Sequence, residues 1–163
     1  MPGTRTTRYA ADGARRLAAR LWHLLAGPLQ WRALWLVHAK FTVGVTGVVR
    51  DGDGNVLLLR HRLWRRDRPW GLPTGCARRG ETLAETVVRE VREETGLDVR
   101  VGGLLRLESG YRLRLEAAYE ARLTGGTLRI DPFEILEAGW FPPDALPAGL
   151  LESHRRLIER GPD

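Results

Sequence analysis

The sequence predicts an α/β fold, an α/β/α sandwich around a mixed β-sheet, with an added N-terminal helical segment. Three observations lead to this prediction. Two strand-like segments flank a turn at 51–55, a helix with clear start and stop signals follows at 82–95, and further strand-like segments come after that helix. Helices that alternate with strands through mostly short connections are typical of layered α/β domains.

The first two strands are predicted to form a hairpin. Residues 41–49, FTVGVTGVV, are rich in β-branched side chains, and residues 56–60, VLLLR, are a second apolar run. The intervening DGDGN at 51–55 contains the residue types that favour tight turns. We therefore expect the two segments to pair with each other.

The helix at 82–95 carries signals at both ends. Thr82 followed by Glu85 forms a capping box, in which each side chain accepts a hydrogen bond from a backbone N–H of the first turn. Gly96 after the helix is suited to a left-handed C-terminal cap. An apolar stripe between these ends is formed by Leu83, Val87, Val88 and Val91.

The rest of the chain is predicted to add three strands and a last helix. The strands are expected at about 98–107, 111–123 and 136–141, and the helix at about 150–160. The apolar side of this helix would carry Leu150, Leu151, His154, Leu157 and Ile158.

The chain is divided here into an N-terminal helical extension, 1–40, and a domain, 41–163. Within the extension, residues 11–26 suggest a basic amphipathic helix that Gly27 and Pro28 would break. This segment is too interrupted by polar residues to predict an integral membrane span.

The apolar residues of the extension need a surface to cover, since Trp31 and Trp35 lie one turn apart beyond the break. Exposed apolar patches usually mark an interface. We expect packing on the domain or on a second copy of the chain, which would give a homodimer. A helix lying at a membrane surface and a mobile segment are the alternatives.

Composition narrows the class of protein. A chain of 163 residues with 43% hydrophobic content is long enough for one domain with a sizeable core. One cysteine, Cys76, excludes an intramolecular disulfide, and the polar start of the chain argues against a signal peptide, so we expect a cytoplasmic protein. The net charge is +6, and almost all of the positively charged residues are arginine. This excess of arginine either favours phosphate-rich ligands or reflects a compositional bias.

Three glutamates lie on one face of the predicted helix. Glu90 and Glu94 are one turn apart and Glu93 lies between them, so their carboxylates can converge. Oxygen ligands of this kind favour a hard cation such as Mg²⁺, or Mn²⁺. Taken alone, the cluster is also consistent with a solvated helix face, because Arg89 and Glu93 have the spacing of an ordinary ion pair.

The residues around this cluster form a longer pattern. The segment matches G-x5-E-x7-R-E-U-x-E-E-x-G-U, where U is aliphatic, at Gly75, Glu81, Arg89, Glu90, Val91, Glu93, Glu94, Gly96 and Leu97. With every constrained position filled, the chain resembles the Nudix hydrolase family, and the resemblance extends over roughly residues 41–145.

The resemblance implies an activity. A member of this family would hydrolyse a diphosphate bond in a nucleoside diphosphate linked to another moiety, with Mg²⁺ or Mn²⁺ as cofactor and a nucleotide-type small molecule as substrate. It leaves open nucleoside triphosphates, nucleotide sugars, ADP-ribose and dinucleotides. Two other classes stay open: a nucleotide-binding regulatory domain without catalysis, and an enzyme that processes RNA 5′ ends.

The resemblance also implies roles for individual residues. The metal ligands by residue-for-residue match are Glu90, Glu93 and Glu94. A backbone carbonyl of Thr74 or Gly75 would complete the metal shell. Arg89 would orient a carboxylate, and Glu93 or Glu94 would accept the proton of the attacking water.

Five further features are weaker candidates. Glu134 and Glu137 could supply an additional base or ligand, or be ordinary exposed carboxylates. Trp64 and Tyr111 could stack on a base, or pack beside the hairpin. The arginines within 61–68 could contact phosphates, or lie in a solvated loop.

Overall fold

The chain consists of two compact units, Met1–Lys40 and Phe41–Asp163, in a computed structural model that describes residues 16, 19–20, 22–23, 27–110 and 113–160. The predicted helix at 11–26 falls mostly outside these residues. The described positions within it, Arg16, Ala19, Arg20, Trp22 and His23, are helical.

Helix α2, Gly27–Val37, starts where the sequence suggested a break. Pro28 lies in its first turn, where a missing N–H costs nothing because that donor has no helical partner. Trp31 and Trp35 are exposed, and the Lys40 ammonium lies 4.4 Å from the centre of the Trp35 ring. No helix in the described part of the chain is long and apolar enough to cross a membrane. A homodimer through this segment stays a prediction.

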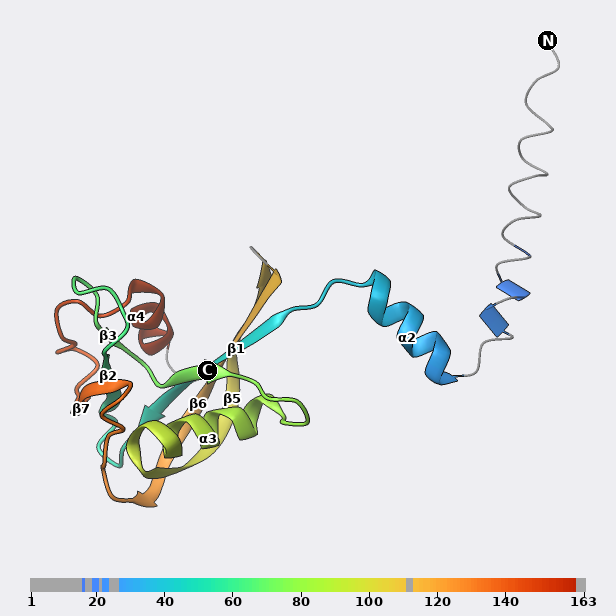
Figure 1. The fold of residues 1–163 in the computed structure, drawn as a ribbon. Helices are drawn as coiled ribbons and strands as arrows, with labels where there is room; N and C mark the ends of the chain where they lie inside the picture. Colours follow the sequence, from blue (N-terminus) through green and yellow to red (C-terminus); the bar gives the residue numbers. More distant parts are fainter. Residues whose placement is uncertain (1–15, 17–18, 21, 24–26, 111–112, 161–163) are drawn as a thin grey trace, which may run out of the picture. The chain divides into compact units, whose positions relative to one another are not determined.

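The domain is built on one seven-stranded sheet (Figure 1). Its path runs β3-β2-β1-β6-β5, while β4 also pairs with β1 and β7 with β2. The strands are β1 Thr42–Arg50, β2 Val56–His61, β3 Trp70–Gly71, β4 Thr74–Cys76, β5 Leu97–Gly110, β6 Arg114–Gly126 and β7 Ile135–Phe141.

The sheet is mixed, as expected. β1 and β6 run parallel in an unbroken register from Thr42 opposite Arg114 to Arg50 opposite Arg122, whereas the other pairs are antiparallel. The predicted hairpin is confirmed, because β1 and β2 pair antiparallel beside their turn at Arg50 and Val56. Farther from the turn, β1 pairs with β4 instead.

Strands β3 and β4 were not predicted from the sequence. No element was predicted between the hairpin and the helix at 82–95, yet Thr74–Cys76 pairs with Gly44–Thr46 of β1. Strands of two and three residues, separated by Leu72 and Pro73, are too short to show an alternating pattern. Their position matters because β4 carries the backbone past helix α3.

Helix α3, Leu83–Thr95, has the predicted ends. Thr82 Oγ1 accepts a hydrogen bond from the Glu85 N–H at 3.2 Å, and the Glu85 carboxylate accepts one from the Thr82 N–H at 2.8 Å. Gly96 has a φ of 70°, a left-handed conformation that costs glycine little. The capping box and the C-terminal cap are therefore both confirmed.

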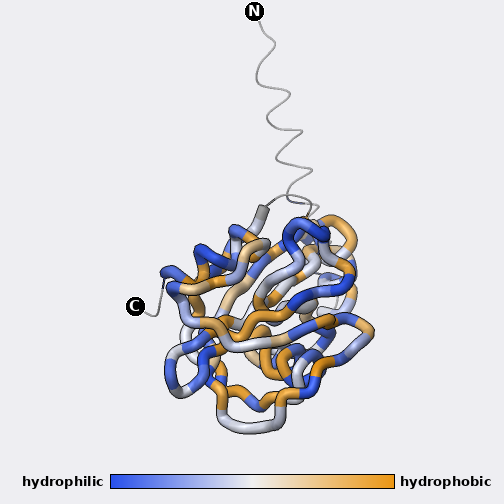
Figure 2. Tube along the Cα trace, turned by 90° about the vertical axis from the view of Figure 1, so that its left-hand side faces the viewer, coloured by the Kyte–Doolittle hydropathy of each residue, from blue (hydrophilic) through white to orange (hydrophobic). Residues whose placement is uncertain are grey.

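Two apolar layers, one on each face of the sheet, complete the domain. Val45 and Val49 of β1 pack in the layer under α3, and Val48 packs in the layer that includes Leu157 of α4, Glu152–Glu159. Hydrophobic segments run through the centre of the domain in Figure 2. The predicted α/β/α sandwich is confirmed.

Two histidines are buried, His61 at the end of β2 and His154 on α4. The His61 ring stacks on Trp64 with ring centres 3.8 Å apart, and His154 Nδ1 accepts a hydrogen bond from the Leu72 N–H at 2.9 Å. Burial lowers the pKa of each imidazole from 6.5 to about 4, and for His154 the proximity of His61 adds to this. Both are therefore neutral in the folded protein above about pH 4.

We expect stability to fall as the pH drops from about 6.5 to 4. In that range the unfolded chain binds protons on both imidazoles and the folded chain does not, so acid favours unfolding by on the order of 3 kcal/mol for each group. The measurement is the free energy of urea unfolding against pH. His154→Asn, which keeps an acceptor for Leu72, should flatten the curve, whereas the exposed His38→Gln should not. Equal slopes in these two variants would contradict the prediction.

Candidate active site

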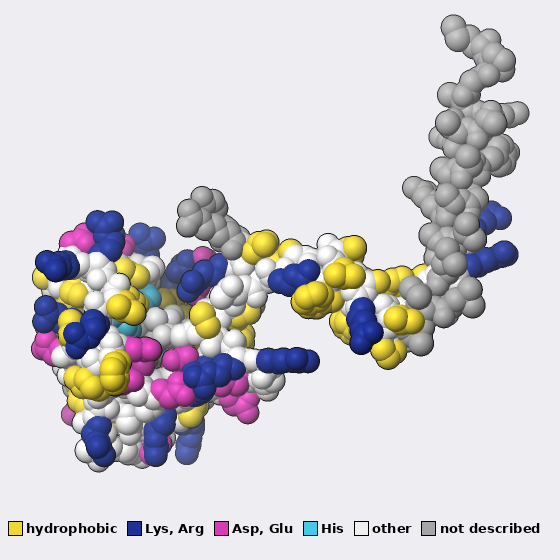
Figure 3. Space-filling model, viewed as in Figure 1, with side chains coloured by type: hydrophobic (Ala, Val, Ile, Leu, Met, Phe, Trp, Pro, Cys, Tyr) yellow, Lys and Arg dark blue, Asp and Glu magenta, His cyan; other side chains and the backbone are white. Residues whose placement is uncertain are grey.

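A cavity of about 520 Å³ collects most of the carboxylates that the sequence singled out. Strand β4, helix α3 and the loop before β7 contribute its walls, and acidic side chains with basic ones beside them cover the face where α3 lies (Figure 3). The lining residues are Thr74, Gly75, Arg78, Glu90, Glu93, Glu94, Asp131 and Glu134.

Gly75 is required where β4 passes α3. Pairing of Gly75 with Val45 holds this backbone against the helix. A Cβ atom built on Gly75 would overlap the carboxylate of Glu90. The glycine therefore forms a cradle in which the Glu90 side chain lies directly against the main chain.

Glu94 is the buried member of the cluster. The residue is 4% exposed, and Oε2 has no hydrogen-bond partner within the described part of the chain. Burial raises the pKa of its carboxyl to about 9, the negative charges of Glu90 and Glu134 add to the shift, and the Thr74 N–H opposes it. A buried carboxylate oxygen without a partner is costly, which suits it to a cation.

Arg89 ties the loop before α3 to the helix. Its Nε donates to Glu81 Oε1 at 2.5 Å, and its Nη1 donates to Glu90 at 2.6 Å and to Glu93 at 3.1 Å. A further bond goes from Nη2 to the Cys76 carbonyl at 3.0 Å. This guanidinium lowers the pKa of Glu81 to about 2, and the carboxylates in turn raise the pKa of Arg89.

Glu93 lies at the exposed rim and faces a second arginine. Arg78 donates from Nη1 and Nη2 to the two oxygens of Glu93, at 3.1 and 3.0 Å. Within the described part of the chain, no three acidic, histidine or cysteine side chains are close enough together to hold a metal ion. The guanidinium groups of Arg78 and Arg89 are bonded to two of the three carboxylates that the sequence suggested would converge, Glu90 and Glu93.

The residues nevertheless fit a divalent cation. Both Glu90 and Glu94 line the cavity; the Glu90 carboxylate lies against the Gly75 backbone, and Glu94 Oε2 has no hydrogen-bond partner among the described residues. Carboxylate and carbonyl oxygens are the ligands that Mg²⁺ and Mn²⁺ prefer. A metal here would be held by the three glutamates of α3 and a backbone carbonyl of β4.

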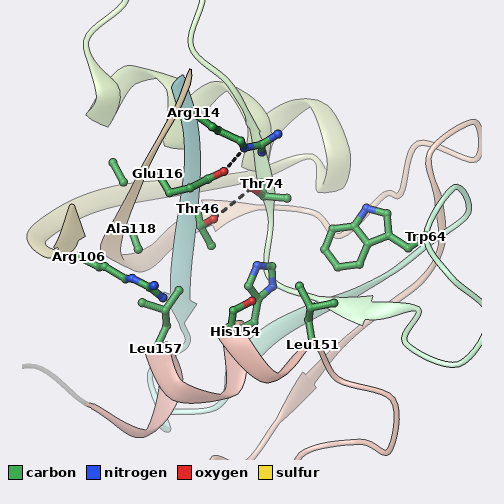
Figure 4. A pocket seen from close by; sticks show the side chains of 12 residues that line it. Thr46, Trp64, Thr74, Arg106, Arg114, Glu116, Ala118, Leu151, His154 and Leu157 are labelled. Atoms are coloured by element: carbon green, nitrogen blue, oxygen red, sulfur yellow. Dashed lines mark hydrogen bonds and ion pairs between the residues drawn. The ribbon is translucent and has the colours of Figure 1, made fainter. Parts of the chain in front are cut away.

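A second cavity, of about 300 Å³, adjoins the first. Thr74 lines both, and its Oγ1 lies 3.1 Å from Thr46 Oγ1 and donates to the Val45 carbonyl at 3.0 Å. In Figure 4 the Trp64 indole faces this cavity from the side opposite Arg106. Its other lining residues are Arg114, Glu116, Ala117, Ala118, Leu151, Ser153, His154 and Leu157.

Of the weaker candidates from the sequence, some line the two cavities and others do not. Glu134 lines the acidic cavity, whereas Glu137 lies on β7 and pairs with Arg60 at 3.6 Å. Trp64 lines the second cavity, and Tyr111 lies outside the described residues. The loop arginines point elsewhere: Arg62 donates to the Pro132 carbonyl, and Arg65 and Arg68 pair with Asp67.

Sequence reasoning missed several lining residues. Asp131 and Arg78 join the acidic cavity although neither stands at a constrained position of the motif. The second cavity is assembled from β1, β5, β6 and α4, so Thr46, Arg106, Glu116 and His154 meet only through the fold. Alternation along a strand gives the face of such residues, but it does not identify the facing partner.

Comparison with known proteins identifies the family of this chain. The family profile described as NUDIX domain matches residues 40–161. Because this match covers most of the chain, the chain belongs to the Nudix hydrolase family.

Three relatives illustrate the range of similarity. The chain is 34% identical over 122 residues to the 8-oxo-dGDP phosphatase NUDT18 of Mus musculus, a match that covers 72% of this chain and 38% of that protein. It is 37% identical over 127 residues to the putative mutator protein MutT4 of Mycobacterium tuberculosis, covering 69% and 51%. It is 36% identical over 118 residues to the NAD-capped RNA hydrolase NudC of Pectobacterium carotovorum, covering 68% and 43%. The chain thus spans about half or less of the length of these relatives.

A solved structure has the same fold. The MutT NUDIX hydrolase from Burkholderia pseudomallei superposes with a TM-score of 0.65 at 26% identity, covering 76% of this chain and 99% of that one.

Proposed function

We propose that this protein is a Mg²⁺-dependent hydrolase that cleaves a diphosphate bond in a nucleoside diphosphate linked to another moiety. The observation that carries the proposal is the acidic cavity at the Gly75 cradle, which shares Thr74 with a second cavity of a size suited to a nucleoside. Family membership and relatives named as nucleotide phosphatases support it.

Each residue of the acidic cavity has a proposed task. Glu90, Glu93 and Glu94, with a backbone carbonyl of Thr74 or Gly75, hold the metal. Bound there, Mg²⁺ supplies charge neutralisation of phosphate oxygens and a lowered pKa for a coordinated water. Arg89 keeps Glu90 and Glu93 in position, and Glu93 or Glu94 accepts the proton of the attacking water.

The second cavity is the proposed nucleoside site. Trp64 offers an aromatic wall for packing, while Arg106, Glu116 and Thr46 offer hydrogen-bonding groups for polar edges of a base or sugar. Because Thr74 lies between the cavities, a nucleoside bound on one side would extend its phosphates towards the glutamates on the other.

Hydrolysis is expected to depend strictly on a divalent cation. A cavity lined by five carboxylates repels a diphosphate unless their charge is offset. The experiment is a panel of nucleoside triphosphates, nucleotide sugars, ADP-ribose and dinucleotides, with phosphate products measured in Mg²⁺, in Mn²⁺ and after exhaustive EDTA treatment. Turnover that survives EDTA would overturn the metal requirement.

The same panel tests two alternative functions. A domain that binds nucleotides only for regulation would bind members of the panel and hydrolyse none. An RNA 5′-end processing enzyme would prefer capped RNA over the small nucleotides in direct competition, and its binding would weaken steeply with salt. The similarity to a protein named NAD-capped RNA hydrolase is the reason to include capped RNA in the experiment.

A further inference from the structure

We propose that Arg78 is a positioning residue that holds Glu93 before substrate arrives and then passes its guanidinium to the diphosphate. This inference rests on the proposed function, because it assigns a role in the same cavity.

The base of Arg78 is fixed while its tip is accessible. Its backbone N–H donates to Glu81 Oε2 at 2.9 Å, and Glu81 is itself bonded to Arg89. The Arg78 side chain is 60% exposed and Glu93 is 48% exposed. The guanidinium can therefore swing without disturbing the turn that carries it.

The charges that line the cavity make Arg78 the side chain suited to bind a phosphate group. Among the described residues that line the cavity, it carries the only positive charge, facing carboxylates from α3 and from the loop before β7. A diphosphate entering here would meet Arg78 as the one lining side chain that attracts it. The planar guanidinium matches two phosphate oxygens as well as it matches two carboxylate oxygens.

The bond between Arg78 and Glu93 is suited to exchange. Exposed ion pairs contribute little to stability, so this pair costs little to break once a phosphate offers the same two contacts. When Arg78 leaves, Glu93 Oε2 keeps its bond from Arg89 Nη1, and Oε1, which Arg78 had held, would become available to a metal ion. Arg78 thereby couples arrival of the phosphate to completion of the ligand set.

Arg89 cannot perform this exchange. Its side chain is 15% exposed and bonds to three carboxylates and a carbonyl. Removing Arg89 would disturb the whole loop and helix junction, whereas removing Arg78 leaves that junction in place. The two arginines are therefore separable by experiment.

The test uses the full chain and two measurements on Arg78→Ala. The first is the affinity for Mn²⁺ without substrate, in which the free ion is measured by electron paramagnetic resonance. Loss of the fork releases Glu93 Oε1 while Arg89 still holds Oε2, so Mn²⁺ should bind roughly two- to fivefold more tightly. The second is steady-state kinetics with the best substrate of the panel, where KM should rise roughly tenfold or more and kcat should change little.

Two further variants define the comparison. Arg78→Lys keeps the charge without the planar fork and should give an intermediate KM. Arg79→Ala removes the neighbouring exposed arginine, which does not line the cavity, and should match the wild type in both measurements. Melting temperatures establish that all three remain folded.

The outcomes separate this inference from the proposed function. Tighter Mn²⁺ binding together with a raised KM supports it. A KM equal to that of Arg79→Ala, or Mn²⁺ binding that is unchanged or weaker in Arg78→Ala, overturns it. If no compound of the panel is hydrolysed, the proposed function fails by itself, and the Mn²⁺ titration still decides whether Arg78 restrains Glu93.

Discussion

Glu94→Gln is expected to reduce turnover roughly a hundredfold or more while the fold stays intact. The amide keeps the size of the side chain and an oxygen that accepts from the Thr74 N–H, but it loses the charge proposed to bind the metal. In the metal-free protein the carboxyl already carries a proton at neutral pH, because its pKa is raised to about 9 by burial and by neighbouring carboxylates. The substitution should therefore leave the metal-free melting temperature unchanged or slightly higher.

Two measurements check this expectation. The wild-type melting temperature should rise with added Mg²⁺, since a ligand that binds the folded state stabilises it, and the rise should be lost in the variant. Glu137→Gln is the matched control, because Glu137 is an exposed carboxylate paired with Arg60 outside the cavity. A Glu94→Gln enzyme with at least half the wild-type rate at saturating Mg²⁺ would show that Glu94 is not a ligand.

Gly75→Ala should damage both stability and activity. The added Cβ overlaps the Glu90 carboxylate, so either β4 or the Glu90 side chain must move. Overpacking of this kind costs about 1 to 3 kcal/mol, and displacement of a reacting group by about 1 Å costs roughly a hundredfold in rate.

The control for Gly75→Ala is another glycine in the same domain. A Cβ on Gly52 meets no atom within 4 Å, so Gly52→Ala should match the wild type in melting temperature and turnover. Rescue offers a second check: Glu90→Asp shortens the offending side chain and should recover part of the stability lost in Gly75→Ala. Full activity in the single variant Gly75→Ala would mean that the cradle is not needed.

Local signals predicted the parts of the fold that depend on local chemistry. Thr82, Glu85 and Gly96 determine the ends of α3 through contacts within a few residues, so the sequence placed that helix closely. The strands at 42–50 and 56–61 were likewise evident from side-chain type. The short strand at Thr74–Cys76 exists because β1 offers it an edge, which no local pattern encodes.

The candidate site divides in the same way. The spacing of Glu90, Glu93 and Glu94 along one helix could be read directly, and the structure places them in one cavity. The bonds of Arg78 to Glu93 join residues fifteen positions apart across a turn, so they depend on how that turn folds. The second cavity was not predicted, because its walls come from distant strands and the last helix.

The position of Thr74 between the two cavities bears on how the substrate range of this fold could change. It is the residue shared by two cavities whose other walls come from different parts of the chain, α3 and its flanking loops for one, and β5, β6 and α4 for the other. If the second cavity binds the nucleoside as proposed, substitutions at Arg106 or Glu116 would change which molecule is recognised while the residues proposed for chemistry stay untouched. Substrate selectivity and catalytic rate would then change independently of each other. Thr74 is the position where a single substitution would alter both.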